Sequence, residues 1–90
     1  MVILLNLVVE EDKMSEKKLT ELEVGKKAVI RRILGDPFFK RKLMNMGAIP
    51  GTELRLEKVA PLGDPLDIVV KGYHLSLRKE EAENIIVEEC

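Results

Sequence analysis

The sequence predicts a mainly β fold, a small β-barrel of about five strands with one short α-helix inserted. Three observations predict this fold: short alternating segments of strand length, tight turns at near-regular intervals, and one amphipathic segment of helical period. The 90 residues suffice for one domain with a thin core. Apolar residues make up 46% of the chain and charged residues 34%, a composition typical of a globular domain.

The chain is expected to divide into an N-terminal extension, residues 1–14, and a folded domain, residues 15–90. Met1–Val9 is apolar and β-branched, which predicts an extra strand that pairs with the barrel edge or with a second copy in a homodimer. A secretory signal would begin with basic residues, whereas no Lys or Arg precedes this run. Alternatively, Met14 is a translation start, and the residues before it are an extension.

A capped turn and a long strand come first in the folded domain. Leu19–Glu23 is expected to be a turn in which the Thr20 side chain accepts a hydrogen bond from the Glu23 amide. Gly25 then leads into a strand over Lys26–Leu34. Because the alternation of apolar residues is imperfect in this strand, we expect a β-bulge within it.

A short helix is predicted over Phe38–Met46, with signals at both ends. Asp36 is a favourable N-cap residue, and Pro37 fits the first helical position, where its missing N–H is not needed. Gly47 follows the last helical residue and suits the left-handed conformation that ends many helices.

The predicted helix has one apolar stripe that should face the core. Phe39, Leu43 and Met46 lie at positions i, i+4 and i+7, on one side of a helix. Phe38 and Met44 lie off this stripe. We expect them to close the end of the barrel rather than to form an interface, although Met suits adaptable interfaces.

The second half of the chain predicts four more strands joined by tight turns. A type II turn is expected at Ile49–Thr52, because Pro and Gly occupy its central positions. A turn-rich loop at residues 61–65 and a helical turn at Lys79–Asn84 separate further segments. The expected strands cover residues 52–60, 66–71, 73–78 and 85–88.

The inventory of reactive side chains argues against an enzyme. A single histidine, His74, and a single cysteine, Cys90, exclude an internal disulfide framework, a cysteine zinc site and a cluster of histidines. Serine and threonine hydroxyls have one imidazole to serve as base, and the phosphate-binding loop motif is absent from the sequence. No apolar run has the length of a membrane span.

The formal net charge of −1 conceals a separation of charge along the chain. Residues 26–42 hold seven basic residues and one acidic residue, whereas residues 79–90 hold five acidic residues and one basic residue. A basic patch can steer the approach of an acidic partner, although such charges are commonly only solvated faces. Nucleic acid is not an expected partner, because the net charge is near zero and only three aromatic residues are present. The candidate partner-binding residues are Arg31, Arg32, Lys40, Arg41 and Lys42.

Three segments, in this order and spacing, resemble the FeoA family. They are KRKLMNMGAIPGTEL at residues 40–54, APLGDPLDI at residues 60–68 and GYHLSLRKEEA at residues 72–82. The resemblance spans Lys18 to Glu88 and implies an SH3-like β-barrel with an inserted helix. It also implies a role in ferrous iron uptake, with a membrane transporter of the FeoB type, which carries a cytoplasmic GTP-binding domain, as partner.

The resemblance leaves two functions open. The first is a non-enzymatic, cytoplasmic accessory protein that docks on the cytoplasmic part of the transporter and modulates it, recruited to the inner face of the membrane. The second is a metal-responsive regulatory module, because similar barrels occur at the C-terminus of iron-dependent repressors of the DtxR type. Fe²⁺ favours imidazole and carboxylate ligands, so His74 is the one weak candidate ligand for Fe²⁺ or another divalent transition metal. We expect no tightly bound cofactor.

Overall fold

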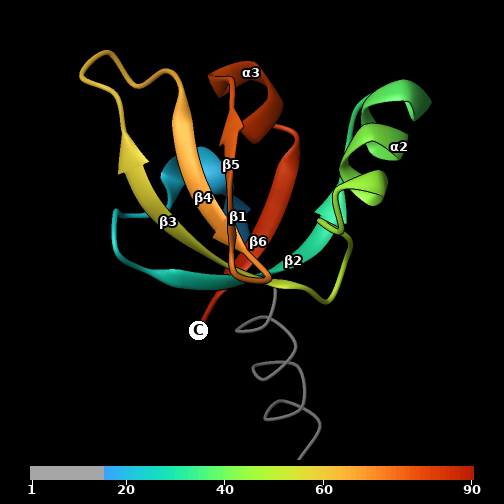
Figure 1. The fold of residues 1–90 in the computed structure, drawn as a ribbon, viewed down its shortest axis with the longest axis horizontal. Coiled ribbons are helices and arrows are strands. Elements are labelled where there is room, and N and C mark those ends of the chain that lie inside the picture. The colour runs from blue at the N-terminus through green and yellow to red at the C-terminus, as the bar shows by residue number, and fades with distance from the viewer. Residues whose placement is uncertain (1–15) are drawn as a thin grey trace, which may run out of the picture.

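The computed structural model describes residues 16–90, and these residues form a curved antiparallel sheet with short helices at its margins (Figure 1). In chain order the elements are β1 (Glu16–Lys18), the 3-10 helix η1 (Leu19–Glu21), β2 (Lys27–Ile33), α2 (Pro37–Asn45), β3 (Glu53–Val59), β4 (Leu66–Val70), β5 (Tyr73–Leu77), α3 (Lys79–Ala82) and β6 (Ile85–Glu89). The predicted mainly β fold with one inserted helix is confirmed: α2 has nine residues, and the other α-helix, α3, is a single turn of four. The predicted strand at Met1–Val9 lies outside the described residues.

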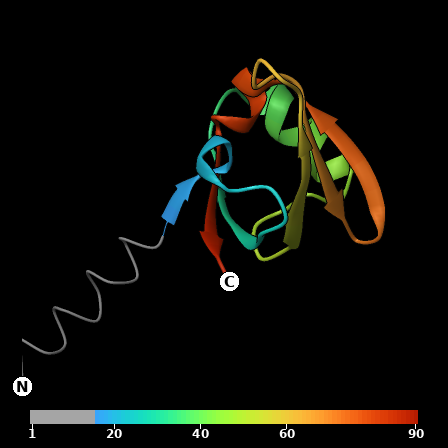
Figure 2. The ribbon, with the colours of Figure 1, turned by 90° about the vertical axis from the view of Figure 1, so that its left-hand side faces the viewer.

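The sheet has six strands in the order β1-β6-β2-β3-β4-β5, and every pair of neighbours is antiparallel. Seen from the side, the sheet curves so that β1, β6 and β2 face β3, β4 and β5 across the core (Figure 2). The sixth strand is β1, which the sequence did not predict. It is three residues long and largely charged, and it forms because Glu16–Lys18 pairs with the closing strand β6.

Two β-bulges bend the longest strands. The register between β2 and β6 shifts between Ile30 and Arg32, which confirms the predicted bulge. A second shift lies between Leu56 and Lys58, where β3 pairs with β4. Because a bulge increases the local twist of a strand, these two sites help the sheet to curve around its core.

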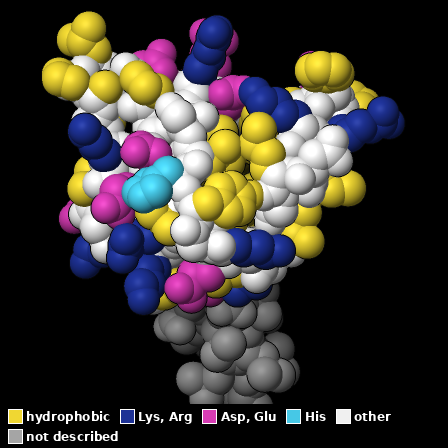
Figure 3. Space-filling model, viewed as in Figure 1, with side chains coloured by type: hydrophobic (Ala, Val, Ile, Leu, Met, Phe, Trp, Pro, Cys, Tyr) yellow, Lys and Arg dark blue, Asp and Glu magenta, His cyan; other side chains and the backbone are white. Residues whose placement is uncertain are grey.

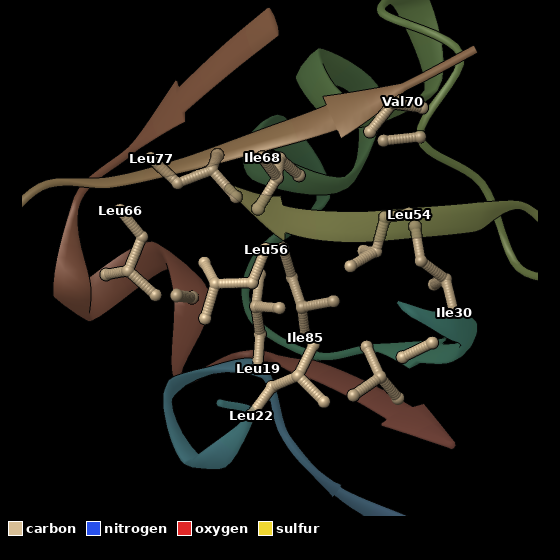
Figure 4. Packing of buried hydrophobic residues seen from close by; sticks show 14 of the residues in the cluster. Leu19, Leu22, Ile30, Leu54, Leu56, Leu66, Ile68, Val70, Leu77 and Ile85 are labelled. Carbon is tan, nitrogen blue, oxygen red and sulfur yellow. The ribbon is translucent and has the colours of Figure 1, made fainter. Parts of the chain in front are cut away.

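The core consists of aliphatic side chains from every strand except β1, together with residues of η1, α2 and α3 (Figure 4). No polar or charged residue among residues 16–90 is buried. Burying these side chains is the main favourable contribution to folding. The side chains that are less than 2% exposed and largest in volume are Leu19, Ile30, Leu43, Leu54, Leu56, Ile68, Leu77, Ile85, Val70 and Val87.

The first turn is capped differently from the prediction. Thr20 and Glu23 do not form the expected capping pair. Instead, the Glu21 carboxylate accepts a hydrogen bond from the Lys18 N–H at 2.8 Å. The reason lies in packing: Leu19 and Leu22 are both buried in the core, and this shifts the turn so that its third residue is Glu21.

The turn and helix predictions in the middle of the chain are largely confirmed. The Thr52 N–H donates to the Ile49 carbonyl at 3.0 Å, and Gly51 has a φ of +93°, as a type II turn requires. The predicted helical turn at 79–84 is observed as α3. Among residues 16–90 no helix is long and apolar enough to cross a lipid bilayer.

Candidate functional site

Helix α2 covers Pro37–Asn45, one residue earlier at each end than the predicted Phe38–Met46, and it has the predicted N-cap. The Asp36 carboxylate accepts a hydrogen bond from the Phe39 N–H at 2.8 Å, and Pro37 occupies the first helical position. Gly47 has a φ of +84°, so the chain turns away in the left-handed conformation that glycine adopts readily. These two ends give α2 a defined length of nine residues.

One face of α2 packs on the core and the opposite face carries exposed apolar side chains. Leu43 is fully buried and Phe39 packs against the core, as predicted, whereas Met46, the third residue of the predicted stripe, is not in the core cluster and lies at the surface of α2. Phe38 and Met44 were expected to close the barrel end, and this expectation is wrong: they are 82% and 62% exposed. The cause is helical geometry: at about 100° per residue, Phe38 lies about 140° and Met44 about 100° around the helix axis from Leu43, so neither faces the core.

The predicted basic residues of β2 are neutralised within the fold. Arg31 Nε lies 2.8 Å from Glu88 Oε1, and Arg32 Nη2 lies 2.9 Å from Glu16 Oε1. These contacts form because the basic strand β2 and the acidic strand β6 are antiparallel neighbours, with β1 beyond. Basic and acidic residues that lie far apart in the sequence are therefore paired between strands of one sheet.

A further ion pair on this face ties β1 to β6. Lys17 Nζ lies 2.9 Å from Glu89 Oε1. The hydrogen bond and charge of Glu89 hold the pKa of Lys17 above its ordinary value, and the same contact lowers the pKa of Glu89. Both partners are on the surface, so the pair is a modest contribution to stability.

The three predicted basic residues of α2 differ in their partners. Lys42 Nζ donates to Glu81 Oε2 at 3.1 Å, and this contact joins α2 to α3. Lys40 and Arg41 form no ion pair or side-chain hydrogen bond with any of residues 16–90, and both are exposed. Figure 3 shows hydrophobic and basic side chains together over the part of the surface that α2 occupies.

The surface of α2 also contains a shallow hollow with a volume of about 380 Å³. The side chains around it come from one helix, at spacings of three, four, seven and eight residues. They are Phe38, Arg41, Lys42, Asn45 and Met46. We name this hollow, with the side chains around it, the α2 outer face.

The carboxyl group of Glu81, which pairs with Lys42 of this face, has an altered pKa. Partial burial alone would raise the pKa of the carboxyl group, but the hydrogen bond from the Arg78 N–H, at 2.9 Å, and the contacts with Lys42 outweigh it. The pKa of Glu81 is therefore held below its ordinary value. Glu81 thus stays ionised and keeps Lys42 in place at neutral pH.

The candidate metal ligand His74 lies on β5 with its side chain 64% exposed. Its Nδ1 atom is 3.9 Å from Asp67 Oδ2 on β4, and Cys90 is exposed at the end of the chain. Within residues 16–90 there is no group of three or more His, Cys, Asp or Glu side chains arranged to hold a metal ion. A metal site at His74 stays a prediction that would need ligands from elsewhere.

The family model described as FeoA domain matches residues 17–89. The chain belongs to the FeoA family. It is 38% identical over 71 residues to the Fe(2+) transport protein A/Fe(2+) transporter FeoB fusion protein of Porphyromonas gingivalis. That match covers 79% of this chain and 8% of the relative, so this FeoA domain spans a small part of the fusion protein's length.

Solved structures agree with the assignment of this FeoA domain. The FeoA protein of Chlorobium tepidum has a TM-score of 0.78 at 37% identity, covering 81% of this chain and 70% of that one. FeoA of Stenotrophomonas maltophilia was solved with zinc and is described as a prokaryotic SH3 domain protein. Its TM-score is 0.70 at 28% identity, covering 80% of this chain and 89% of that one. The predicted SH3-like fold is confirmed.

The predicted likeness to repressor barrels is also confirmed at the level of fold. IdeR of T. acidophilum matches with a TM-score of 0.76 at 25% identity, covering 84% of this chain and 35% of that one. The FeoA domain therefore corresponds to about a third of that protein. Both functional alternatives drawn from the sequence thus have a structural relative.

Proposed function

We propose that this protein is a non-enzymatic accessory protein of ferrous iron uptake, which docks on the cytoplasmic part of a FeoB-type transporter and modulates it. The observation that carries the proposal is the relative in which Fe(2+) transport protein A and FeoB form one polypeptide. Fusion holds two modules at a high effective concentration, which is useful when the modules bind one another. In this proposal the protein acts in the cytoplasm, at the inner face of the membrane.

The proposed docking surface contains the five basic residues predicted from the sequence, with unequal roles. Lys40 and Arg41 supply most of the available charge, because neither has an acidic partner within residues 16–90. Arg31, Arg32 and Lys42 are already paired with carboxylates and contribute less. Basic charge without an internal partner speeds encounter with an acidic surface and favours the correct orientation.

A modulating rather than catalytic role fits the side chains of the chain. The single imidazole, His74, is largely exposed on the surface of the sheet. Within residues 16–90 no hydrogen bond joins this imidazole to a Ser, Thr or Cys side chain, so it is poorly placed to activate one of them as a nucleophile. The protein would therefore act by binding, with GTP bound by the transporter.

The direct test is calorimetric titration of this protein into the full-length transporter of its own organism, in detergent, with GTP, with GDP and without nucleotide. The proposal predicts saturable binding whose affinity depends on the nucleotide. Absence of binding in all three states would contradict docking on the transporter. Binding that is independent of nucleotide would contradict modulation through the GTP-binding domain but not docking.

The second candidate function is a metal-responsive regulatory module, and the fold match to IdeR favours it. A metal that binds the native form raises the free energy of unfolding. The second function predicts that saturating Fe²⁺ or Mn²⁺ raises the melting temperature, and that His74→Ala removes the increase. The first function predicts an unchanged melting temperature.

A further inference from the structure

We infer that the α2 outer face binds an acidic amphipathic helix of the transporter, with Phe38 as its apolar anchor. The inference rests on the proposed function and adds the chemistry of the contact. Arg41, three residues after Phe38 on the same side of α2, would face a carboxylate of that helix. An apolar side chain of the helix would enter the hollow between Phe38 and Met46.

The first argument is the exposure of Phe38. This side chain is 82% exposed, whereas the neighbouring Phe39 packs against the core. An exposed phenylalanine adds apolar area that the folding of residues 16–90 does not bury. Large apolar side chains of this kind, surrounded by charges, are typical of the centre of a protein interface.

The second argument is the shape of the hollow. Its five side chains form two neighbouring rows along α2, one of Phe38, Lys42 and Met46 and the other of Arg41 and Asn45, and a groove runs between such rows on a helix surface. A second helix can place a ridge of side chains into such a groove. A lipid surface has no fixed ridge to match it, so the hollow favours a helical protein segment over a membrane.

The third argument is charge complementarity. Of the three basic side chains of α2, Lys42 has a carboxylate partner within residues 16–90, which is Glu81. Lys40 and Arg41 have none, and Arg41 is one of the side chains around the hollow that Phe38 lines. A partner helix with Asp or Glu beside its apolar residues would supply the missing carboxylates, and Arg41 could bind one through two parallel hydrogen bonds.

The test compares two substitutions at apolar residues that are both more than 80% exposed. Phe38→Asp alters the α2 outer face. Leu62→Asp is the matched control, because Leu62 is 92% exposed in the loop between β3 and β4. Affinity is measured for the full chain against the full-length transporter in nanodiscs of neutral lipid, with empty neutral discs and empty anionic discs as further probes. Circular dichroism melting of each variant shows that the fold is retained.

The inference predicts that Phe38→Asp weakens binding to the transporter at least about tenfold, whereas Leu62→Asp binds like the unaltered protein. Arg41→Glu should weaken binding strongly, and Arg41→Lys should weaken it less, because lysine keeps the charge but cannot form the two parallel hydrogen bonds. Equal affinity of Phe38→Asp and the unaltered protein would overturn the inference and leave the proposed function standing. Binding to empty anionic discs that Phe38→Asp abolishes would assign the face to lipid. If the unaltered protein binds no transporter, the proposed function fails, and the inference with it.

Discussion

Phe38 and Phe39 are adjacent in the sequence and have opposite surroundings. Phe38 is 82% exposed, whereas Phe39 packs on the core beside Leu43. A rotation of about 100° per residue separates the two rings around the helix axis. The same rotation gives the two residues different roles, one in binding and one in folding.

This difference predicts separate effects of truncation. Leu43→Ala should lower the free energy of unfolding by about 2–5 kcal/mol, because it leaves a cavity in the core. Phe38→Ala should change it by less than about 0.5 kcal/mol, because the side chain makes few contacts. Urea unfolding of both variants measures the two values. A loss at Phe38 as large as that at Leu43 would contradict the exposure of Phe38.

Glu81 predicts a pH-dependent contribution to stability. Its folded pKa is lowered by Arg78 and Lys42 despite partial burial, so its ionised form stabilises the native state. This contribution is fully present above the unfolded pKa of about 4.3 and is lost as the pH falls through the lower folded pKa. Glu81→Gln keeps an acceptor for the Arg78 N–H but removes the charge.

The variant Glu81→Gln should therefore be less stable than the unaltered protein at pH 7, by about 0.5–1 kcal/mol. The difference should shrink as the pH falls below about 4. Denaturant unfolding across this range measures both curves. A difference that stays constant with pH would show that the carboxylate charge is not the source of the effect.

At the scale of elements, α2 depends on its N-cap. The Asp36 carboxylate satisfies the Phe39 N–H at 2.8 Å, one of the amides at the start of the helix that have no partner within it. Asp36→Ala should cost about 1 kcal/mol of stability, and Asp36→Asn should cost less because asparagine also caps well. Thermal melting of the two variants checks the order. Equal losses would show that the side-chain acceptor is not what matters.

The elements differ in how far the sequence predicts them. α2 and the type II turn were predicted because local signals specify them: Asp36, Pro37 and Gly47 for the helix, and Gly51 for the turn. β1 was missed because three residues carry no periodicity, and pairing with β6 creates the strand.

The candidate site was predicted only in part, because the sequence shows the charged residues but not the contacts between elements that are far apart in the chain. The basic residues of α2 can be found from their charge, but their partners depend on which strands and helices become neighbours. Arg31 and Arg32 meet Glu88 and Glu16 only in the folded sheet. The exposure of Phe38 could have been found from the helical wheel, because it lies off the Phe39–Leu43 stripe.

At the scale of the molecule, salt should affect the ion pairs within the fold less than the binding of a partner through Lys40 and Arg41. The ion pairs of β1, β2 and β6 lie on the surface, so screening them should change the free energy of unfolding by less than about 1 kcal/mol. Binding through Lys40 and Arg41 should weaken clearly over the same range, because association of opposite charges is screened. Melting and affinity at low and high NaCl measure the two responses. A large change in the free energy of unfolding together with an unchanged affinity would contradict this expectation.

The measurement that tests the central claim most directly is the affinity of two double variants for the full-length transporter. Lys40→Gln with Arg41→Gln removes the basic charge of α2 that has no partner within residues 16–90, and Arg31→Gln with Arg32→Gln removes paired charge on β2. The claim that the protein docks through α2 predicts a loss of about tenfold or more in the α2 variant and a small change in the β2 variant. Equal losses, or a loss confined to the β2 variant, would contradict it.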